Sequence, residues 1–224
     1  MNRFKSACVA LLLVVPLVQA GEYNKKITIG DASPVWKELP GTDGKNHSLE
    51  DLKDKDVVVV VFLCNSCPIA NDYESRLNEF AKAHATADGR VALVAINVNI
   101  IPDDRLDKMK VRAEKKKYAF AYLYDETQKI AKDFGATYTP EFFVLDKSRR
   151  VVYMGAMDDK SNESEATTNF LDAAVSAVLK DAKMPGKAET LARGCMIRYK
   201  KERGAPTDSG IRRRSSRRST GCCS

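Results

Sequence analysis

Residues 57–68 read VVVVVFLCNSCP, an apolar run that ends in two cysteines separated by two residues. Consecutive apolar residues, most of them β-branched, are typical of a central strand that is covered on both faces, as in a parallel sheet flanked by helices. From Ile69 to His84, apolar residues then recur at helical spacing. The stretch therefore predicts a buried strand, a turn that carries Cys64 and Cys67, and one long helix.

The segments on either side continue the alternation of strands and helices. We expect strands at 90–99, 121–124, 141–146 and 151–155, and helices at 103–117, 126–134 and 164–180. Earlier in the chain, Asp43-Gly44 predicts a hairpin turn. The order β-α-β-α-β is typical of parallel strands joined by crossover helices, and the last two strands would add an antiparallel edge. The predicted fold class is α/β, with a central mixed β-sheet flanked by helices.

Composition and charge exclude some classes of function. The chain has 224 residues, of which 44% are hydrophobic and 30% are charged, and this composition is typical of one globular domain. The formal net charge of +7 comes from the two ends, 1–20 and 203–224, which leaves residues 21–202 without net charge. A surface that binds nucleic acid needs an excess of Lys and Arg. We therefore expect no nucleic acid to bind to the folded body.

The two ends of the chain differ from the domain at 21–202. Residues 1–20 have a positive start, an apolar stretch and Val18-Gln19-Ala20, which together predict a signal peptide cleaved after Ala20. The apolar stretch is too short to span about 30 Å of hydrocarbon, so we expect no transmembrane segment in the mature chain. Residues 203–224, which include Cys222 and Cys223, predict a disordered basic tail. The expected location is periplasmic or extracytoplasmic.

The cysteine pair carries the predicted chemistry. The first turn of a helix has unpaired N–H groups and a partial positive charge, which would lower the pKa of Cys64. Cys64 would then be the exposed nucleophile, and Cys67 would attack the captured sulfur and release the partner. A structural disulfide, half of a zinc site, and chance cysteines in a reduced compartment are the alternatives, and the export signal disfavours the last of them. The other His and Cys residues lack the spacing of a second ligand pair, so no metal or cofactor is expected.

Residues 28–182 resemble thioredoxin-fold proteins of the exported redoxin group. This group includes peroxiredoxin-like proteins, of the alkyl hydroperoxide reductase and thiol-specific antioxidant type, and the thiol-disulfide reductases of cytochrome c maturation. The resemblance is carried by GDASPVW (30–36), VVVVVFLCNSCP (57–68), ALVAINVN (92–99) and YTPEFFVLD (138–146). It implies a thioredoxin-like fold in which Pro140 follows a cis bond and lies beside the cysteine pair. It also implies that Thr139 pairs its backbone with a bound substrate.

The sequence also departs from the patterns of these families. Thioredoxins have Trp before the first cysteine, where this chain has Leu63, and their buried acid falls here on Val58. The threonine and proline of the peroxidatic motif of peroxiredoxins are absent. Cys195 is the odd cysteine of the folded body, and it is either a buried inert thiol or a third redox thiol. His84, on the apolar face of its helix, is expected in the core.

These observations favour an exported thiol-disulfide oxidoreductase. The catalytic pair would be Cys64 and Cys67, the substrate groove would lie at Thr139 and Pro140, and Cys195 is a possible additional redox thiol. The expected partners are protein thiols or disulfides and an electron donor or acceptor. Two other classes stay open. One is a thiol-dependent peroxidase, and the other is a non-enzymatic thioredoxin-like binding domain with a permanent Cys64–Cys67 disulfide.

Overall fold

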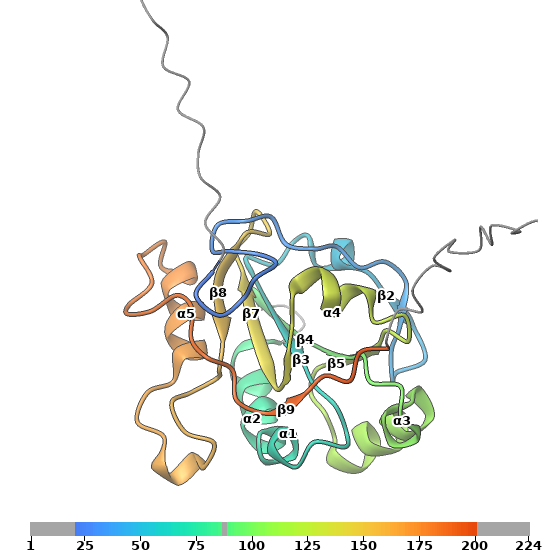
Figure 1. The fold of residues 1–224 in the computed structure, drawn as a ribbon. Coiled ribbons are helices and arrows are strands. Elements are labelled where there is room, and N and C mark those ends of the chain that lie inside the picture. The colour runs from blue at the N-terminus through green and yellow to red at the C-terminus, as the bar shows by residue number, and fades with distance from the viewer. Residues whose placement is uncertain (1–20, 87–88, 201–224) are drawn as a thin grey trace, which may run out of the picture.

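A five-stranded mixed sheet forms the centre of the structure, a computed structural model that describes residues 21–86 and 89–200 (Figure 1). The strands are β3 (Val57–Phe62), β4 (Val91–Asn97), β5 (Ala121–Tyr124), β7 (Glu141–Leu145) and β8 (Val151–Gly155), in the order β5-β4-β3-β7-β8. β3, β4 and β5 run parallel, whereas β7 is antiparallel to β3 and β8 is antiparallel to β7. The predicted mixed sheet is confirmed. The predicted signal peptide and basic tail lie outside the described residues.

Within the described residues, five α-helices and three short 3₁₀ turns connect the strands. The helices are α1 (Pro68–Asp72), α2 (Glu74–His84), α3 (Leu106–Lys116), α4 (Lys129–Phe134) and α5 (Phe170–Leu179), and the turns are η1 (Leu49–Leu52), η2 (Pro102–Asp104) and η3 (Glu163–Glu165). The predicted hairpin is formed by β1 (Leu39–Pro40) and β2 (Asn46–His47). None of the helices in the described part of the chain has the length and apolar character needed to cross a bilayer.

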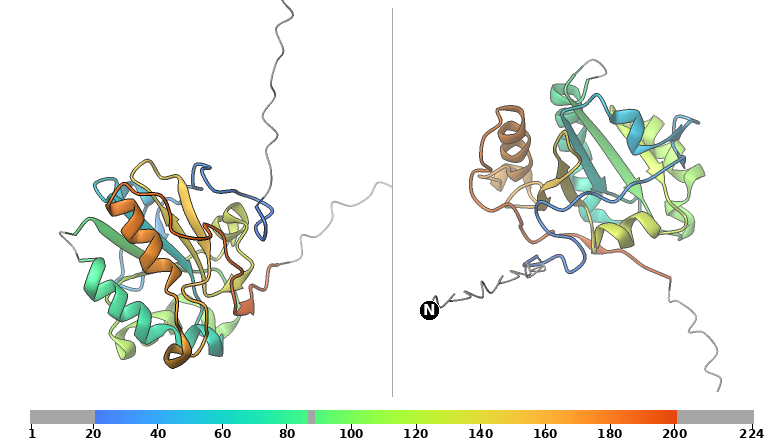
Figure 2. Two further views of the ribbon diagram at one scale, coloured as in Figure 1. Left: turned by 90° about the vertical axis from the view of Figure 1, so that its left-hand side faces the viewer. Right: turned by 90° about the horizontal axis from the view of Figure 1, so that it is seen from above.

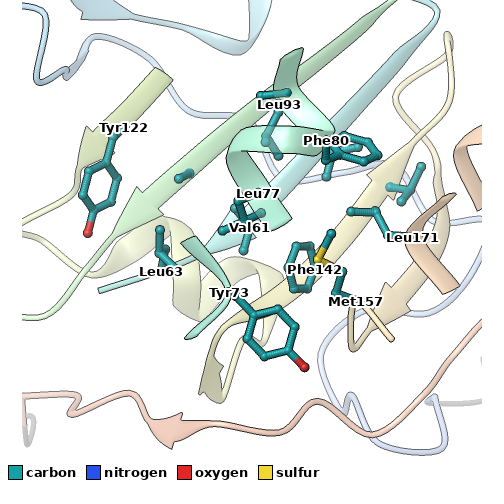
Figure 3. Packing of buried hydrophobic residues seen from close by; sticks show 14 of the residues in the cluster. Val61, Leu63, Tyr73, Leu77, Phe80, Leu93, Tyr122, Phe142, Met157 and Leu171 are labelled. Atoms are coloured by element: carbon teal, nitrogen blue, oxygen red, sulfur yellow. The ribbon is translucent and has the colours of Figure 1, made fainter. Parts of the chain in front are cut away.

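Two buried clusters cover the two faces of the sheet. Side chains alternate along a strand, so the odd-numbered residues of β3 enter one cluster and the even-numbered residues enter the other. The first cluster packs against α2 and α5, and Figure 3 shows its centre around Val61, Leu77 and Phe142. The second includes Trp36 and residues of α4. In the left view of Figure 2, α2 and α5 lie together in front of the sheet. β3 is buried along its whole length, as its apolar run predicts.

The long helix predicted after the cysteine pair is two helices. α1 ends at Asp72, Tyr73 caps it, and α2 begins at Glu74. The Tyr73 hydroxyl donates to Asp158 at 2.9 Å, and its ring lies 6.5 Å from the ring of Phe142. Tertiary contacts therefore hold the residue that separates the two helices. The local spacing of apolar residues carries no information about these contacts.

Two expectations at helix ends are wrong. The last helix begins at Phe170 rather than at residue 164, because the side chain of Asn169 caps it by accepting the N–H of Asp172. His84 is exposed and is not a core histidine. The buried face of α2 ends at Ala81, one turn earlier, and the imidazole of His84 lies 3.7 Å from the carboxylate of Asp172.

The C-terminal part of the described chain adds a short strand beside the loop that precedes β7. There, β6 (Tyr138–Thr139) pairs with β9 (Cys195–Met196) in antiparallel register. Figure 1 shows this segment, in orange-red, crossing the end of the molecule near α1. A strand of two residues has no periodicity, so the sequence pattern gives no sign of it. This pairing places Cys195 at the same end of the sheet as Cys64 and Cys67.

Candidate functional site

The cysteine pair lies in the turn between β3 and α1. The backbone N–H of Leu63 bonds to the carbonyl of Ile96 at 3.0 Å, which continues the pairing of β3 with β4 up to the turn. Cys67 is the N-cap of α1, and its Sγ accepts the N–H of Ala70 at 3.3 Å. Pro68 occupies the first helical position, where its fixed φ suits a helix start. The position predicted for Cys64, at the helix start, therefore belongs to Cys67.

A buried carboxylate lies beneath the middle of this turn. Asp104, in η2 after β4, is 0% exposed. Its carboxylate accepts the N–H of Asn65 at 2.6 Å, the N–H of Ser66 at 3.0 Å and the hydroxyl of Ser66 at 2.6 Å. The side-chain amide of Asn99 donates to it at 3.2 Å. The backbone N–H groups that could have stabilised a thiolate on Cys64 are thus bound to an acid.

The two thiols lie close enough to influence each other's protonation, and their pKa values move in opposite directions. The contact with Cys67 raises the pKa of Cys64, and both burial and the charge of Asp104 raise it further. For Cys67, the hydrogen bond from the Cys64 thiol lowers the pKa to about 5, with help from Cys195 and from the N–H of Ala70. The thiolate is therefore assigned to Cys67.

One contact opposes this assignment. The carbonyl oxygen of Thr139 lies 3.1 Å from Cys67 Sγ and accepts a hydrogen bond only while that thiol is protonated. We nevertheless assign the thiolate to Cys67, because the donors around its sulfur outnumber this single acceptor. The expectation that Cys64 is exposed and has the lowered pKa is wrong. Cys64 is 3% exposed, and Cys67 is 1% exposed.

The loop before β7 packs against both thiols. Its Thr139–Pro140 peptide bond is cis, as the resemblance implies. The Thr139 hydroxyl lies 3.2 Å from Cys64 Sγ. Beneath the loop, the buried carboxylate of Glu141 accepts the N–H groups of Thr137 at 2.7 Å and of Tyr138 at 2.9 Å. Burial raises the pKa of this carboxyl group.

Cys195 is half-buried on the other side of Thr139. β9 pairs Cys195 with Thr139, whose carbonyl oxygen accepts the Cys67 thiol at 3.1 Å. All five residues predicted for the site, namely Cys64, Cys67, Thr139, Pro140 and Cys195, therefore lie together. Trp36 lies in the cluster on the opposite face of the sheet, and not beside the cysteine pair.

Asp104 and Glu141 were missed by the sequence analysis. For Asp104 a signal was available, because the polar residues Asn97, Asn99 and Asp104 follow a buried strand parallel to β3. The carboxyl ends of parallel neighbours meet at one edge of a sheet, so these residues had to lie near the cysteine turn. For Glu141 there was no local signal, since it begins a predicted strand. Within residues 21–86 and 89–200, no group of three or more His, Cys, Asp or Glu side chains is arranged to hold a metal ion.

Comparison with known proteins gives a family and a fold. The family model described as Redoxin matches residues 21–170. An uncharacterized conserved protein from Geobacillus kaustophilus is 34% identical, with a TM-score of 0.72 over 78% of this chain and 94% of that one. A hypothetical protein from Sinorhizobium meliloti 1021 is also 34% identical, with a TM-score of 0.72 over 79% of this chain and 97% of its own.

A more distant structure shows the same fold. It is the C-terminal domain of a provisionally named thiol-disulfide oxidoreductase from Bacteroides thetaiotaomicron. It is 15% identical, with a TM-score of 0.55 over 70% of this chain and 99% of that one. Among curated proteins, none matches the chain.

Proposed function

The chain belongs to the redoxin family, and we propose that it is a thiol-disulfide oxidoreductase whose Cys64 and Cys67 exchange disulfides with partner proteins. Family membership supports a thiol redox function. The observation that carries the finer proposal is the placement of both sulfurs against one residue beside a cis peptide bond. Cys64 Sγ lies 3.2 Å from the Thr139 hydroxyl, Cys67 Sγ lies 3.1 Å from the Thr139 carbonyl oxygen, and the Thr139–Pro140 bond is cis. Two cysteines of one turn held against the same residue can form a disulfide with little movement of the backbone.

Each round of exchange has two steps. In the reducing direction, one cysteine thiolate attacks a sulfur of the partner's disulfide, so that a mixed disulfide forms and one partner thiolate leaves. The second cysteine then attacks the first, the Cys64–Cys67 disulfide forms, and the other partner sulfur leaves. Two electrons pass from the cysteine pair to the partner, and the protons of the pair end on the partner's two thiols. The oxidising direction is the reverse.

The unequal thiols suit this cycle. The thiolate on Cys67 can act as a nucleophile at neutral pH, while Cys64 keeps a proton that it can release when it attacks. An electron donor or acceptor of the same chemical class, a protein dithiol or disulfide, would restore the pair. No cofactor takes part in this scheme.

The proposal includes export. Residues 1–20 would direct the chain across the inner membrane and be removed after Ala20, leaving a domain at 21–202 and a tail at 203–224. The expected result is a mature protein that begins at Gly21 in the extracytoplasmic fraction of expressing cells, measured by N-terminal sequencing. A chain that keeps Met1 and stays in the cytoplasm would contradict export and leave the exchange chemistry untouched.

The exchange activity is tested with a protein disulfide as substrate. Reduction of insulin by dithiothreitol, measured with catalytic amounts of the full chain, should be accelerated by the wild type. Cys67→Ser should abolish the acceleration and Cys64→Ser should lose most of it, because neither variant keeps the Cys64–Cys67 pair. The matched control is Cys222→Ser with Cys223→Ser, which changes cysteines outside the proposed domain and should keep full activity. Unchanged activity in Cys64→Ser would contradict the mechanism.

A further inference from the structure

The backbone edge of Thr139 is already paired within this chain. β9 lies antiparallel to β6, with Cys195 opposite Thr139 and Met196 opposite Tyr138. The Thr139 hydroxyl also donates to the carbonyl of Cys195 at 3.4 Å. The C-terminal segment thus occupies the place where a partner's polypeptide was expected to pair with Thr139, and it brings a thiol of its own.

Contacts beyond β9 hold this segment in place. The N–H of Ile197, whose side chain is buried, donates to the carbonyl of Thr137 at 2.8 Å. The buried amide of Gln128 donates to the carbonyl of Arg198 at 3.0 Å and accepts the N–H of Lys200 at 2.8 Å. Several independent contacts therefore fix the position of Cys195.

Gly194 permits the close approach of the segment to the loop. A Cβ atom at this position would lie 2.0 Å from the carbonyl oxygen of Thr139 and 3.0 Å from the nitrogen of Pro140. These are backbone atoms of a buried loop, and they cannot turn away as a flexible side chain can. Any residue larger than glycine would push Cys195 away from the cysteine pair.

The side chains of β9 alternate in direction. Cys195 packs against the buried cluster that contains Cys64 and Cys67. Met196, the next residue, is 67% exposed. Thr139, opposite Cys195, accepts the Cys67 thiol at its carbonyl oxygen at 3.1 Å, and its hydroxyl lies 3.2 Å from Cys64 Sγ. Burial and the nearby Cys67 thiol raise the pKa of Cys195 to about 11, so Cys67 is the sulfur within its reach.

We propose that Cys195 is a third redox-active thiol, which takes over the disulfide of the oxidised pair by bonding to Cys67. This inference rests on the proposed function, because the Cys64–Cys67 disulfide supplies the sulfur that is attacked. Cys195 Sγ attacks Cys67 Sγ, the Cys67–Cys195 bond forms, and the Cys64–Cys67 bond breaks. The electron pair of the broken bond leaves with Cys64 Sγ, which takes the proton lost by Cys195. No net oxidation or reduction occurs.

The exchange would change which thiol is available for the next step. After it, Cys64 is a free thiol beside an internal disulfide, and β9 is covalently fixed along Thr139. The protein then keeps its two oxidising equivalents in the Cys67–Cys195 disulfide, and this bond fixes β9 over the groove at Thr139 and Pro140. Attack of Cys64 on Cys67 reverses the step and returns the pair to the form that meets partners.

The test is disulfide mapping of the full chain by mass spectrometry after oxidation with diamide. In Cys64→Ser, Cys67 should pair with Cys195 in most chains. In the matched variant Cys67→Ser, a Cys64–Cys195 disulfide should be at least about 10-fold rarer, because Thr139 lies between the two thiols. The wild type should show both Cys64–Cys67 and Cys67–Cys195 bonds, which tests the proposal without any substitution. A Cys195 that stays reduced in both the wild type and Cys64→Ser would overturn the proposal.

A second pair of variants tests the position of β9. Gly194→Ala should lower the yield of the Cys67–Cys195 bond about 10-fold or more and speed alkylation of Cys67. The control Met196→Ala, on the solvent side of the same strand, should change neither. Equal yields in Gly194→Ala and the wild type would count against the proposal.

The insulin assay separates the two hypotheses. If the wild type accelerates insulin reduction but forms no disulfide with Cys195, only the proposal of a third redox-active thiol is refuted. A Cys67–Cys195 bond without insulin reduction refutes the proposed function but leaves this contact redox-active.

Discussion

Cys64 and Cys67 belong to one turn, yet their surroundings are opposite in character. Cys64 lies at the end of a buried strand, above a carboxylate that binds the neighbouring N–H groups. Cys67 caps a helix. The nearby Cys64 thiol lowers its pKa, and its sulfur also accepts the backbone N–H of Ala70. The same chemical group is thus held as a thiol at one position and favoured as a thiolate three residues later.

The comparison shows that a helix start stabilises a thiolate only at the residue that caps it. The sulfur of Cys67 accepts a backbone N–H, whereas the N–H groups beside Cys64, three residues earlier, bind a carboxylate. The pKa of Cys67 is lowered and that of Cys64 is raised. Each of the following substitutions removes one contact that makes the two cysteines different.

The largest effect is expected for the loss of Cys67. Ultraviolet titration of the reduced chain should show a thiolate at neutral pH that is protonated only as the pH falls to about 5, the value assigned to Cys67. A lowered pKa means that the charged form persists below the ordinary thiol range of about 8.5. Cys67→Ser should abolish this signal, whereas Cys195→Ser should keep it. A low-pH thiolate that survives in Cys67→Ser would assign it to Cys64 instead.

A smaller effect is expected at the acid beneath the turn. Asp104→Asn replaces an acceptor with an amide that faces several donors, and it should lower the free energy of unfolding by about 2–3 kcal/mol. It should also lower the pKa of Cys64, since the charge of Asp104 raises it. Urea unfolding and thiol titration measure the two changes. Asp103→Asn, at the exposed neighbour, is the matched control and should stay within about 0.5 kcal/mol of the wild type. Equal stability of the two variants would show that Asp104 does not hold the turn.

The smallest effect is expected for loss of the Thr139 hydroxyl, which lies between Cys64 and Cys195. Thr139→Val keeps the shape of the side chain but removes the group that lies 3.2 Å from Cys64 Sγ and donates to the carbonyl of Cys195. The loss should cost about 1 kcal/mol in urea unfolding. Thr139→Ser keeps the hydroxyl and should recover most of that stability. Equal free energies of unfolding for Thr139→Val and Thr139→Ser would show that the hydroxyl does not stabilise the packing of the cysteine turn and β9 around Thr139.

The sequence was most informative where local pattern decides structure. The apolar runs that became β3 and β4 predicted buried parallel strands, and the cysteines at the end of β3 identified the turn. The resemblance added the loop at Thr139 and Pro140. Periodicity is sufficient for these features because strands of six or seven buried residues leave a clear pattern.

Long-range contacts decided the rest. β9 has two residues, and its position follows from the fit of Gly194 against Thr139 and from the bonds of Gln128, about 70 residues earlier in the chain. The division of the predicted long helix at Tyr73 depends on Asp158. The carboxylate that binds the N–H groups beside Cys64 belongs to Asp104, which follows a different strand. None of these contacts is visible in a local window of sequence.

The most direct test of the proposed chemistry is the redox equilibrium of the full chain in glutathione buffers, read by differential alkylation of Cys64 and Cys67. With Cys195 replaced by Ser, so that no second disulfide of Cys67 competes, both should be oxidised together, as one two-electron disulfide, with a midpoint between about −270 and −120 mV. The opposite result is a pair that stays as thiols, or stays bonded, across that whole range. Either form of inertness would show that these sulfurs are not a reversible redox pair.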